Sequence, residues 1–391
     1  MITKEALIEA TKRILKDSSV ENGAIVAANT DKNYHPRDVS SYRYVWIRDA
    51  SYICVAADIL GIGIQEDFFR WCLERAEGFD RDGVFYQTYH TNGAKAGGQF
   101  QPDQTGTLLW AVWYHYQERP EEAAEFKDLI EKAADGICKL WSRDHFVLQT
   151  YDLWEERSTF PDLEDNHTYS LAACAKGLRC ADALMAELKK NGDRTNKWLR
   201  CAQEQEETIK NLSFSGAPPH DPASPVRAYK TALPKRYYSG YFLRTFGKIN
   251  DSNVDASLLG LVYPFEICSV DDTRMVNTVN VMEKRIVENG GVHRYEKDVY
   301  DGWMQDGKLR SKGAGAWPLL NFWIAIYYTL RREREKAKKY HDWVLNRLDQ
   351  PYIPEQIFEN EWQKAVCPLV WAHAMFIISD RLEPLYVVNN L

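Results

Sequence analysis

Two adjacent carboxylates in the middle of the chain have neighbours that suit proton transfer. Glu155 and Glu156 follow Trp154 and precede an arginine in the segment YDLWEER, Tyr151–Arg157. An indole can pack on the apolar face of a sugar ring, and its bulk excludes water from a nearby carboxyl. Because burial disfavours the charged form, the pKa of that carboxyl rises and it can donate a proton near neutral pH. A solvated turn whose tryptophan fills the core would explain the same residues.

A second cluster of aromatic and charged residues, YRYVWIRD, occupies residues Tyr42–Asp49, just before an expected helix over Ala50–Leu60. Asp49 is a suitable cap for that helix. Capping does not explain why Trp46 and Arg48 stand beside it. An Arg–Asp pair presented to a ligand rich in hydroxyl groups explains all three residues.

The composition narrows the classes of partner. The chain has 391 residues with 45% hydrophobic residues, enough for a sizeable core in one large domain or two ordinary ones. Its 13 Trp and 22 Tyr are typical of binding surfaces that are partly exposed to solvent. The net charge of −7 argues against a surface for nucleic acid or for anionic membranes.

Targeting and metal-binding signals are not found in the sequence. The N-terminus follows an amphipathic pattern without the basic and apolar regions of a secretory signal, and the apolar stretch Ala316–Leu330 is too short to span a membrane. The eight Cys are scattered and form no C-x-x-C pair. We therefore expect a cytoplasmic protein with free thiols, no metal site and no membrane contact.

The periodicity of apolar residues predicts roughly twelve helices and no convincing run of strands. The clusters of aromatic and carboxylate residues fall in the connections between helices, which favours a closed ring of helical hairpins with a pocket on one rim. We read the proline-rich stretch Ser213–Tyr238 as a surface loop and residues 1–391 as a single domain. The expected helices are Met1–Lys16, Ala50–Leu60, Ile64–Glu77, Thr105–Gln117, Glu121–Trp141, Tyr169–Lys190, Asn196–Leu212, Val254–Leu261, Asp272–Glu288, Ala316–Arg331, Glu333–Leu348 and Pro368–Asp380.

Seven short motifs follow one another along the chain. They are YVWIRD (44–49), DLWEER (152–157), VDASLL (254–259), GVHRY (291–295), GAWP (315–318), PEQ (354–356) and WAHA (371–374). In this order they resemble glycoside hydrolase family 15, which contains glucoamylases, glucodextranases and trehalase-like enzymes. The resemblance covers most of the chain and implies an all-α (α/α)6 barrel, in agreement with the expected helices.

The resemblance also implies roles for individual residues. Glu155 matches the general acid of the family and Glu355 its general base. Glu156 matches a carboxylate that contacts the sugar beyond the scissile bond. The residues implied to hold the terminal glucose or to line the pocket are Arg48, Asp49, Arg294, Trp46, Trp154, Trp317 and Trp371.

The chemistry of these residue types is consistent with hydrolysis by inversion. One protonated carboxyl acts on the leaving oxygen while a carboxylate activates water on the opposite face, with the two groups roughly 6.5–9.5 Å apart. A pocket closed behind the terminal sugar makes such an enzyme exo-acting, and its product is β-glucose. The expected partner is an oligosaccharide of α-linked glucose, and the chemistry requires no cofactor.

Several alternatives remain open. The β-sandwich domain that usually precedes the barrel in prokaryotic relatives is not expected here, which favours short oligosaccharides over raw starch. The linkage is open between α-1,4 (glucoamylase-type), α-1,6 (isomaltose or dextran) and trehalose. A catalytically silent carbohydrate-binding or regulatory barrel does not need both Glu155 and Glu355, which are present. A phosphorylase needs a phosphate site, and no glycine-rich phosphate loop is found.

Overall fold

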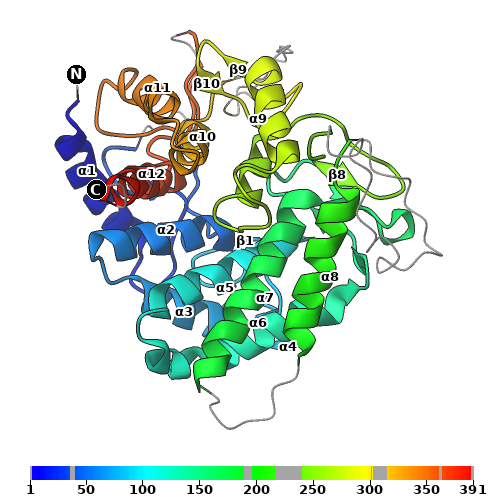
Figure 1. Cartoon of the computed structure of the whole chain (residues 1–391). Coiled ribbons are helices and arrows are strands. Elements are labelled where there is room, and N and C mark those ends of the chain that lie inside the picture. Colours follow the sequence, from blue (N-terminus) through cyan, green and yellow to red (C-terminus); the bar gives the residue numbers. More distant parts are fainter. Residues whose placement is uncertain are drawn as a thin grey trace.

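An inner ring of helical elements surrounds the barrel axis of this protein. The computed structural model describes residues 2–35, 40–188, 196–215, 240–300, 302, 315–360 and 363–388. Each element of this ring packs against the next one in chain order, and the last packs against the first (Figure 1). The elements are α2 (Ile47–Leu60), α5 (Pro102–Tyr116), α7 (Thr168–Leu188), the 3-10 helix η5 (Ala256–Leu261), α10 (Pro318–Leu330) and α12 (Val370–Val388).

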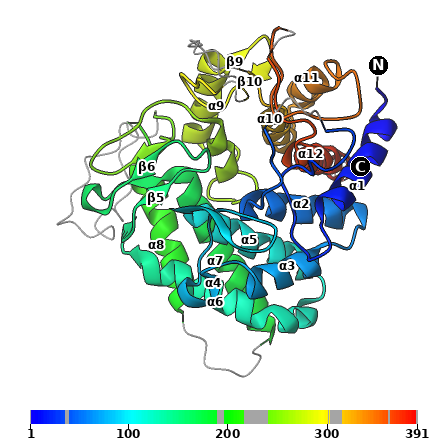
Figure 2. The same cartoon turned by 180° about the vertical axis from the view of Figure 1, so that it is seen from behind.

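A second layer of helices packs around the ring, and each of its members contacts a neighbouring inner element (Figure 2). Its members are α1 (Lys4–Ser18), α3 (Gln65–Glu74), α6 (Lys127–Leu140), α8 (Lys197–Leu212), α9 (Thr273–Arg285) and α11 (Arg334–Leu345). The short α4 (Phe79–Asp82) and the 3-10 helices η1 (Pro120–Phe126) and η2 (Pro161–Leu163) belong to connections. The expectation of an all-α (α/α)6 barrel is confirmed.

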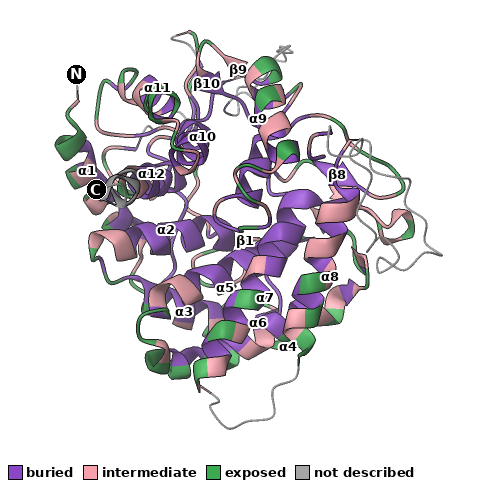
Figure 3. Cartoon of the chain, in the orientation of Figure 1, coloured by how far each residue is buried: buried purple, intermediate pink, exposed green. Residues whose placement is uncertain are grey.

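The two layers differ in how far their residues are buried (Figure 3). The inner helix α10, with the sequence PLLNFWIAIYYTL, is buried from Pro318 to Thr329. The outer helix α8 buries one stripe and exposes the other. A helix that is apolar all round has to lie in the core, whereas an amphipathic helix covers it. Local sequence therefore decides which layer each helix joins.

Two glycines allow the inner helices α5 and α7 to approach closely. A Cβ atom built on Gly106 would lie 2.4 Å from the backbone carbonyl carbon of Ala173, and one on Gly177 would lie 2.5 Å from the carbonyl oxygen of Gly106. Neither position accepts a side chain without movement of a helix. This contact sets the distance between α5 and α7.

Short antiparallel strand pairs occupy the connections within the described residues. They are β1 (Tyr86–Tyr89) with β2 (Lys95–Phe100), β3 (Trp141–Ser142) with β4 (His145–Phe146), β5 (Thr150–Tyr151) with β6 (Ser158–Thr159), β7 (Asn166–His167) with β8 (Thr245–Phe246), and β9 (Val287–Glu288) with β10 (Gly291–Val292). The β1–β2 hairpin lies between the expected helices Ile64–Glu77 and Thr105–Gln117, where we expected no strands. These pairs shape loops and do not form a larger sheet.

Some expected elements differ in detail. The helix over Glu121–Trp141 is divided into η1 and α6, and Val254–Leu261 contains a 3-10 helix. Helix α2 begins at Ile47, so Asp49 lies inside its first turn and does not cap it. The predicted loop Ser213–Tyr238 lies outside the described residues from 216 onward. None of the described helices is both long and apolar enough to cross a membrane.

Candidate active site

One cavity of about 1260 Å³ collects every site residue predicted from the sequence. Its wall includes the first turns of the inner helices α2 and α12, the residue that precedes α10, and the connections between helices. Residues from all parts of the chain therefore meet at one end of the barrel. The predicted residues that line it are Trp46, Arg48, Asp49, Trp154, Glu155, Glu156, Arg294, Trp317, Glu355 and Trp371.

A tight turn between β5 and β6 presents Glu155 to the cavity. The Glu155 backbone N–H donates to the carbonyl oxygen of Asp152 at 3.0 Å. Its φ of +64° lies in the left-handed region, which non-glycine residues rarely adopt. The carboxylate of Asp152 holds the turn, because its Oδ1 accepts the backbone N–H groups of Glu156 at 2.9 Å and Arg157 at 3.0 Å. Such local strain persists only where surrounding contacts impose it.

Both carboxyl oxygens of Glu155 accept a hydrogen bond. Trp46 donates its indole Nε1–H to Oε1 at 2.5 Å, and Gln87 donates its amide Nε2–H to Oε2 at 2.5 Å. Burial raises the pKa of Glu155, while Arg48 and these two donors lower it. The raised pKa follows the expectation from the sequence, but the indole in contact belongs to Trp46 and not to the adjacent Trp154.

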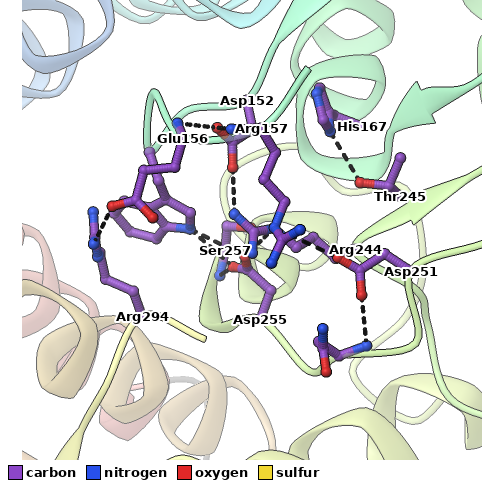
Figure 4. A network of polar contacts seen from close by, with 12 residues as sticks. Asp152, Glu156, Arg157, His167, Arg244, Thr245, Asp251, Asp255, Ser257 and Arg294 are labelled. Carbon is purple, nitrogen blue, oxygen red and sulfur yellow. Dashed lines mark hydrogen bonds and ion pairs between the residues drawn. The ribbon is translucent and has the colours of Figure 1, made fainter. Parts of the chain in front are cut away.

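Trp154 instead contacts Asp255, which forms a buried ionic network with Arg244 and Asp152 (Figure 4). Its Nε1–H donates to both oxygens of Asp255, at 3.1 Å each. The guanidinium of Arg244 lies between two carboxylates, 2.5 Å from Asp152 and 3.1 Å from Asp255. Arg244 also lies over the ring of Tyr295, with its Cζ 4.0 Å from the centroid. The network thus joins the turn that carries Glu155 to the start of η5.

Arg294 follows β10 and forms a second buried ionic centre. It pairs with Asp298 through two hydrogen bonds of 2.7 Å and with Glu156 through one of 2.5 Å. The rings of Trp154, Tyr300 and Trp317 surround its guanidinium, with centroids 4.8–5.5 Å away. The positive charge beside Glu156 favours the ionised form of that carboxylate. Glu156 and Glu155 therefore have different electrostatic surroundings although they are adjacent.

Glu355 lies on the connection before α12 and is 3% exposed. The hydroxyl of Tyr300 donates to its Oε2 at 3.3 Å, and the hydroxyls of Tyr300 and Tyr42 are 2.6 Å apart. Burial raises the pKa of Glu355 to about 7, against the opposing effects of the two tyrosine hydroxyls and of Arg294. A buried carboxyl with a pKa near neutrality is suited to acid–base chemistry.

Arg48 and Asp49 form the deep polar part of the cavity. Arg48 donates to Asp103 at 2.8 Å, and its Nε lies 3.6 Å from Oδ1 of Asp49. That oxygen of Asp49 is buried and has no hydrogen-bond partner among the described protein groups, which suits it to accept a ligand hydroxyl. Trp371 lies below the guanidinium, with its ring centroid 5.6 Å from Arg48 Cζ.

A sequence profile of glycosyl hydrolases family 15 matches residues 72–349. This chain belongs to glycosyl hydrolases family 15. The resemblance inferred from the seven motifs is thus confirmed.

Three proteins are similar to this chain. An uncharacterized glycosyl hydrolase of Methanocaldococcus jannaschii is 31% identical over 397 residues, which cover 96% of this chain and 55% of that protein. Isomaltose glucohydrolase of Kribbella flavida is 25% identical over 379 residues, which cover 88% of this chain and 86% of that protein. A bacterial glucoamylase complexed with acarbose superposes with a TM-score of 0.72 at 20% identity, over 97% of this chain and 55% of that chain. The chain spans about half the length of the first and third relatives.

Three further residues of this family 15 site were not predicted from the sequence. They are Gln87, Tyr300 and Tyr42. Gln87 contacts Glu155, and Tyr300 contacts both Glu355 and Tyr42. Tyr42 belongs to the aromatic cluster that marked the start of α2, so a signal for it was present. Gln87 and Tyr300 lie in stretches whose composition indicates only a loop, and no local pattern distinguishes them.

Proposed function

We propose that this chain hydrolyses short α-glucosides from their non-reducing ends with inversion, releasing β-glucose. The supporting observation is that Glu155 and Glu355, which come from separate connections of the barrel, line one cavity with the Arg48–Asp49 pair. Two carboxyls with raised pKa values and a polar clamp are the parts that this reaction requires. We expect residues 1–391 to act as one catalytic domain.

Glu155 is the better general acid of the adjacent pair. Burial raises the pKa of Glu156 as well, but Arg294 pairs with this carboxylate, opposes that rise and turns it towards binding. No cation lies within ion-pairing distance of Glu155 among the described residues, and burial raises its pKa. Glu355, which matches the general base of the family, then serves as the base, and the hydroxyl of Tyr300 donates to its carboxylate and orients it.

The proposed mechanism assigns the terminal glucose to the deep end of the cavity. Arg48 and Asp49 hold its hydroxyl groups by charge-assisted hydrogen bonds, and the indoles of the cavity pack on its apolar faces. Glu155 transfers its proton to the glycosidic oxygen as the C1–O bond breaks. Glu355 removes a proton from the water that attacks C1 from the opposite face, which yields the inverted product.

For the linkage, we propose α-1,4 cleavage of glucoamylase type, in line with the structural similarity to a glucoamylase. Cleavage of α-1,6 linkages is the second candidate. It is favoured by the match to isomaltose glucohydrolase, which covers most of both chains. Trehalases are also among the relatives, with a match covering 81% of this chain and 45% of the mycobacterial enzyme.

Proton NMR of the first minutes of digestion tests the function and the linkage together. The protein is incubated with maltose, isomaltose, trehalose and maltopentaose in separate samples, and the anomeric signals are followed. We expect β-glucose to appear first from one of them. From maltose, isomaltose or maltopentaose, an initial excess of α-glucose over its equilibrium share would contradict inversion. From trehalose, inversion gives one α-glucose and one β-glucose, so only the absence of β-glucose would contradict it. Cleavage of none by a folded protein would favour the carbohydrate-binding or regulatory alternative.

A further inference from the structure

We propose that Gln87, on strand β1, is a positioning residue for the general acid. Gly97, on the facing strand, leaves the space that the Gln87 side chain needs to reach Glu155. The proposal rests on the assignment of Glu155 as the general acid. No motif of the sequence pointed to either residue. Their role follows from contacts within the β1–β2 hairpin and between this hairpin and the cavity.

Gln87 completes a clamp on the carboxyl group of Glu155. Its Nε2–H donates to Oε2 at 2.5 Å, while Trp46 donates to the other oxygen at 2.5 Å. The two donors come from different segments of the chain, and both line the cavity. A carboxyl held at both oxygens has a fixed orientation. This orientation decides which oxygen faces the leaving group of a bound sugar.

The backbone of Gln87 is itself anchored to the helices that carry other site residues. Its carbonyl oxygen accepts the amide Nε2–H of Gln104 at 3.0 Å. The carbonyl oxygen of the Gln104 side chain accepts the backbone N–H of Arg48 at 2.6 Å. Gln104 is fully buried near the start of α5. The hairpin, α5 and the first turn of α2 therefore hold Gln87 in one position relative to the sugar-binding arginine.

Gly97 leaves the space that the Gln87 side chain occupies. A Cβ atom at position 97 would lie 2.5 Å from Gln87 Oε1 and 2.9 Å from its Cδ. The neighbouring Gly98 has no atom within 4 Å of such a Cβ. The strand register is irregular between Tyr86 and Thr88, the residues on either side of Gln87. A methyl group at position 97 thus displaces the amide, whereas the same group at position 98 does not.

The contact has a definite chemical effect. A donor to a carboxylate stabilises the ionised form, so Gln87 opposes the effect of burial and lowers the pKa of Glu155. Removing the donor leaves Glu155 protonated to higher pH but less firmly oriented. The alkaline limb of kcat should then move to higher pH while the maximal rate falls. A residue with a purely structural role would lower the rate without moving this limb.

The experiment compares Gln87→Leu, Gly97→Ala and the matched control Gly98→Ala with the wild-type protein. The pH dependence of kcat is measured on the disaccharide that is cleaved fastest and on α-glucosyl fluoride, whose leaving group needs little protonation. For Gln87→Leu and Gly97→Ala we expect the alkaline limb to move to higher pH. We also expect kcat to fall about 10-fold or more on the disaccharide and much less on the fluoride. Gly98→Ala should keep the wild-type limb and substrate ratio.

Two results would overturn the proposal. One is a Gln87→Leu variant with the wild-type alkaline limb and the wild-type ratio of the two rates. The other is a Gly97→Ala variant that behaves as Gly98→Ala does. Glu155→Gln separates these failures from failure of the proposed function. Near-normal disaccharide cleavage by Glu155→Gln would refute the assignment of Glu155 as the general acid. A large loss of activity in Glu155→Gln, together with wild-type kinetics of Gln87→Leu, would refute only the role of Gln87.

Discussion

The indole nitrogen of Trp154 and the carboxylate of Asp255, 101 positions apart in the chain, are joined by hydrogen bonds of 3.1 Å to both carboxylate oxygens. Asp255 also accepts the backbone N–H of Ser257 at 2.8 Å and pairs with Arg244 at 3.1 Å. The tryptophan beside the proposed acid is therefore oriented by the start of η5. Two of the seven sequence motifs meet in this contact.

Replacing Arg244 tests the stabilising role of this network. Arg244→Met leaves the buried carboxylates of Asp152 and Asp255 without their cation, so we expect a loss of about 3–5 kcal/mol in the free energy of unfolding. Arg157→Met is the control, because Arg157 lies 3.7 Å from Asp251 with a half-exposed side chain; it should cost less than about 1 kcal/mol. Urea unfolding measures both. Equal losses of unfolding free energy in the two variants would contradict the stabilising role of Arg244 in the network.

Glu155→Gln tests the general acid. The amide keeps the size of the side chain and cannot donate the proton, so we expect kcat on a disaccharide to fall by about 10²–10⁴-fold. KM should change little, because the sugar-binding groups are retained. Steady-state kinetics at the optimal pH give both constants. A near-wild-type kcat would assign the proton transfer to another group.

Tyr300→Phe tests the environment of the proposed base. Burial raises the pKa of Glu355 to about 7, and the hydroxyl of Tyr300 opposes this effect by stabilising the carboxylate. Without that hydroxyl the pKa rises further. Because the base acts in its ionised form, the acidic limb of kcat/KM should move to higher pH. Tyr44→Phe, which removes a hydroxyl elsewhere in the cavity, should leave this limb in place. The same shift of the acidic limb in both variants would argue against a specific effect of Tyr300 on Glu355.

Asp49→Asn tests the clamp on the terminal sugar. The substitution keeps the shape of the side chain but replaces a carboxyl that is charged above its pKa, which burial raises to about 7, with a neutral amide. Hydrogen bonds to charged groups contribute about 1.5–3 kcal/mol, so kcat/KM should fall roughly 10- to 150-fold. Competitive inhibition by glucose, measured alongside, should weaken in the same direction. Unchanged values of both would remove Asp49 from the sugar-binding group.

The sequence by itself determined the family, the class of fold and ten of the residues that line the cavity. Helices such as α10 are apolar all round and must lie in the inner layer, a property that can be read from adjacent residues. The ten site residues belong to short motifs at the ends of elements. Their side chains share one end of the barrel because each motif precedes or begins an inner element. Local patterns therefore carried this information.

Only the tertiary structure decided which side chains touch within the cavity. The partners of Glu155 lie 68 and 109 positions away, at Gln87 and Trp46, whereas the adjacent Trp154 bonds to Asp255 instead. A left-handed φ at Glu155 and the absence of a side chain at Gly97 give the orientation of these groups. Such contacts depend on how distant segments are placed relative to one another, and no local pattern of residues encodes that placement.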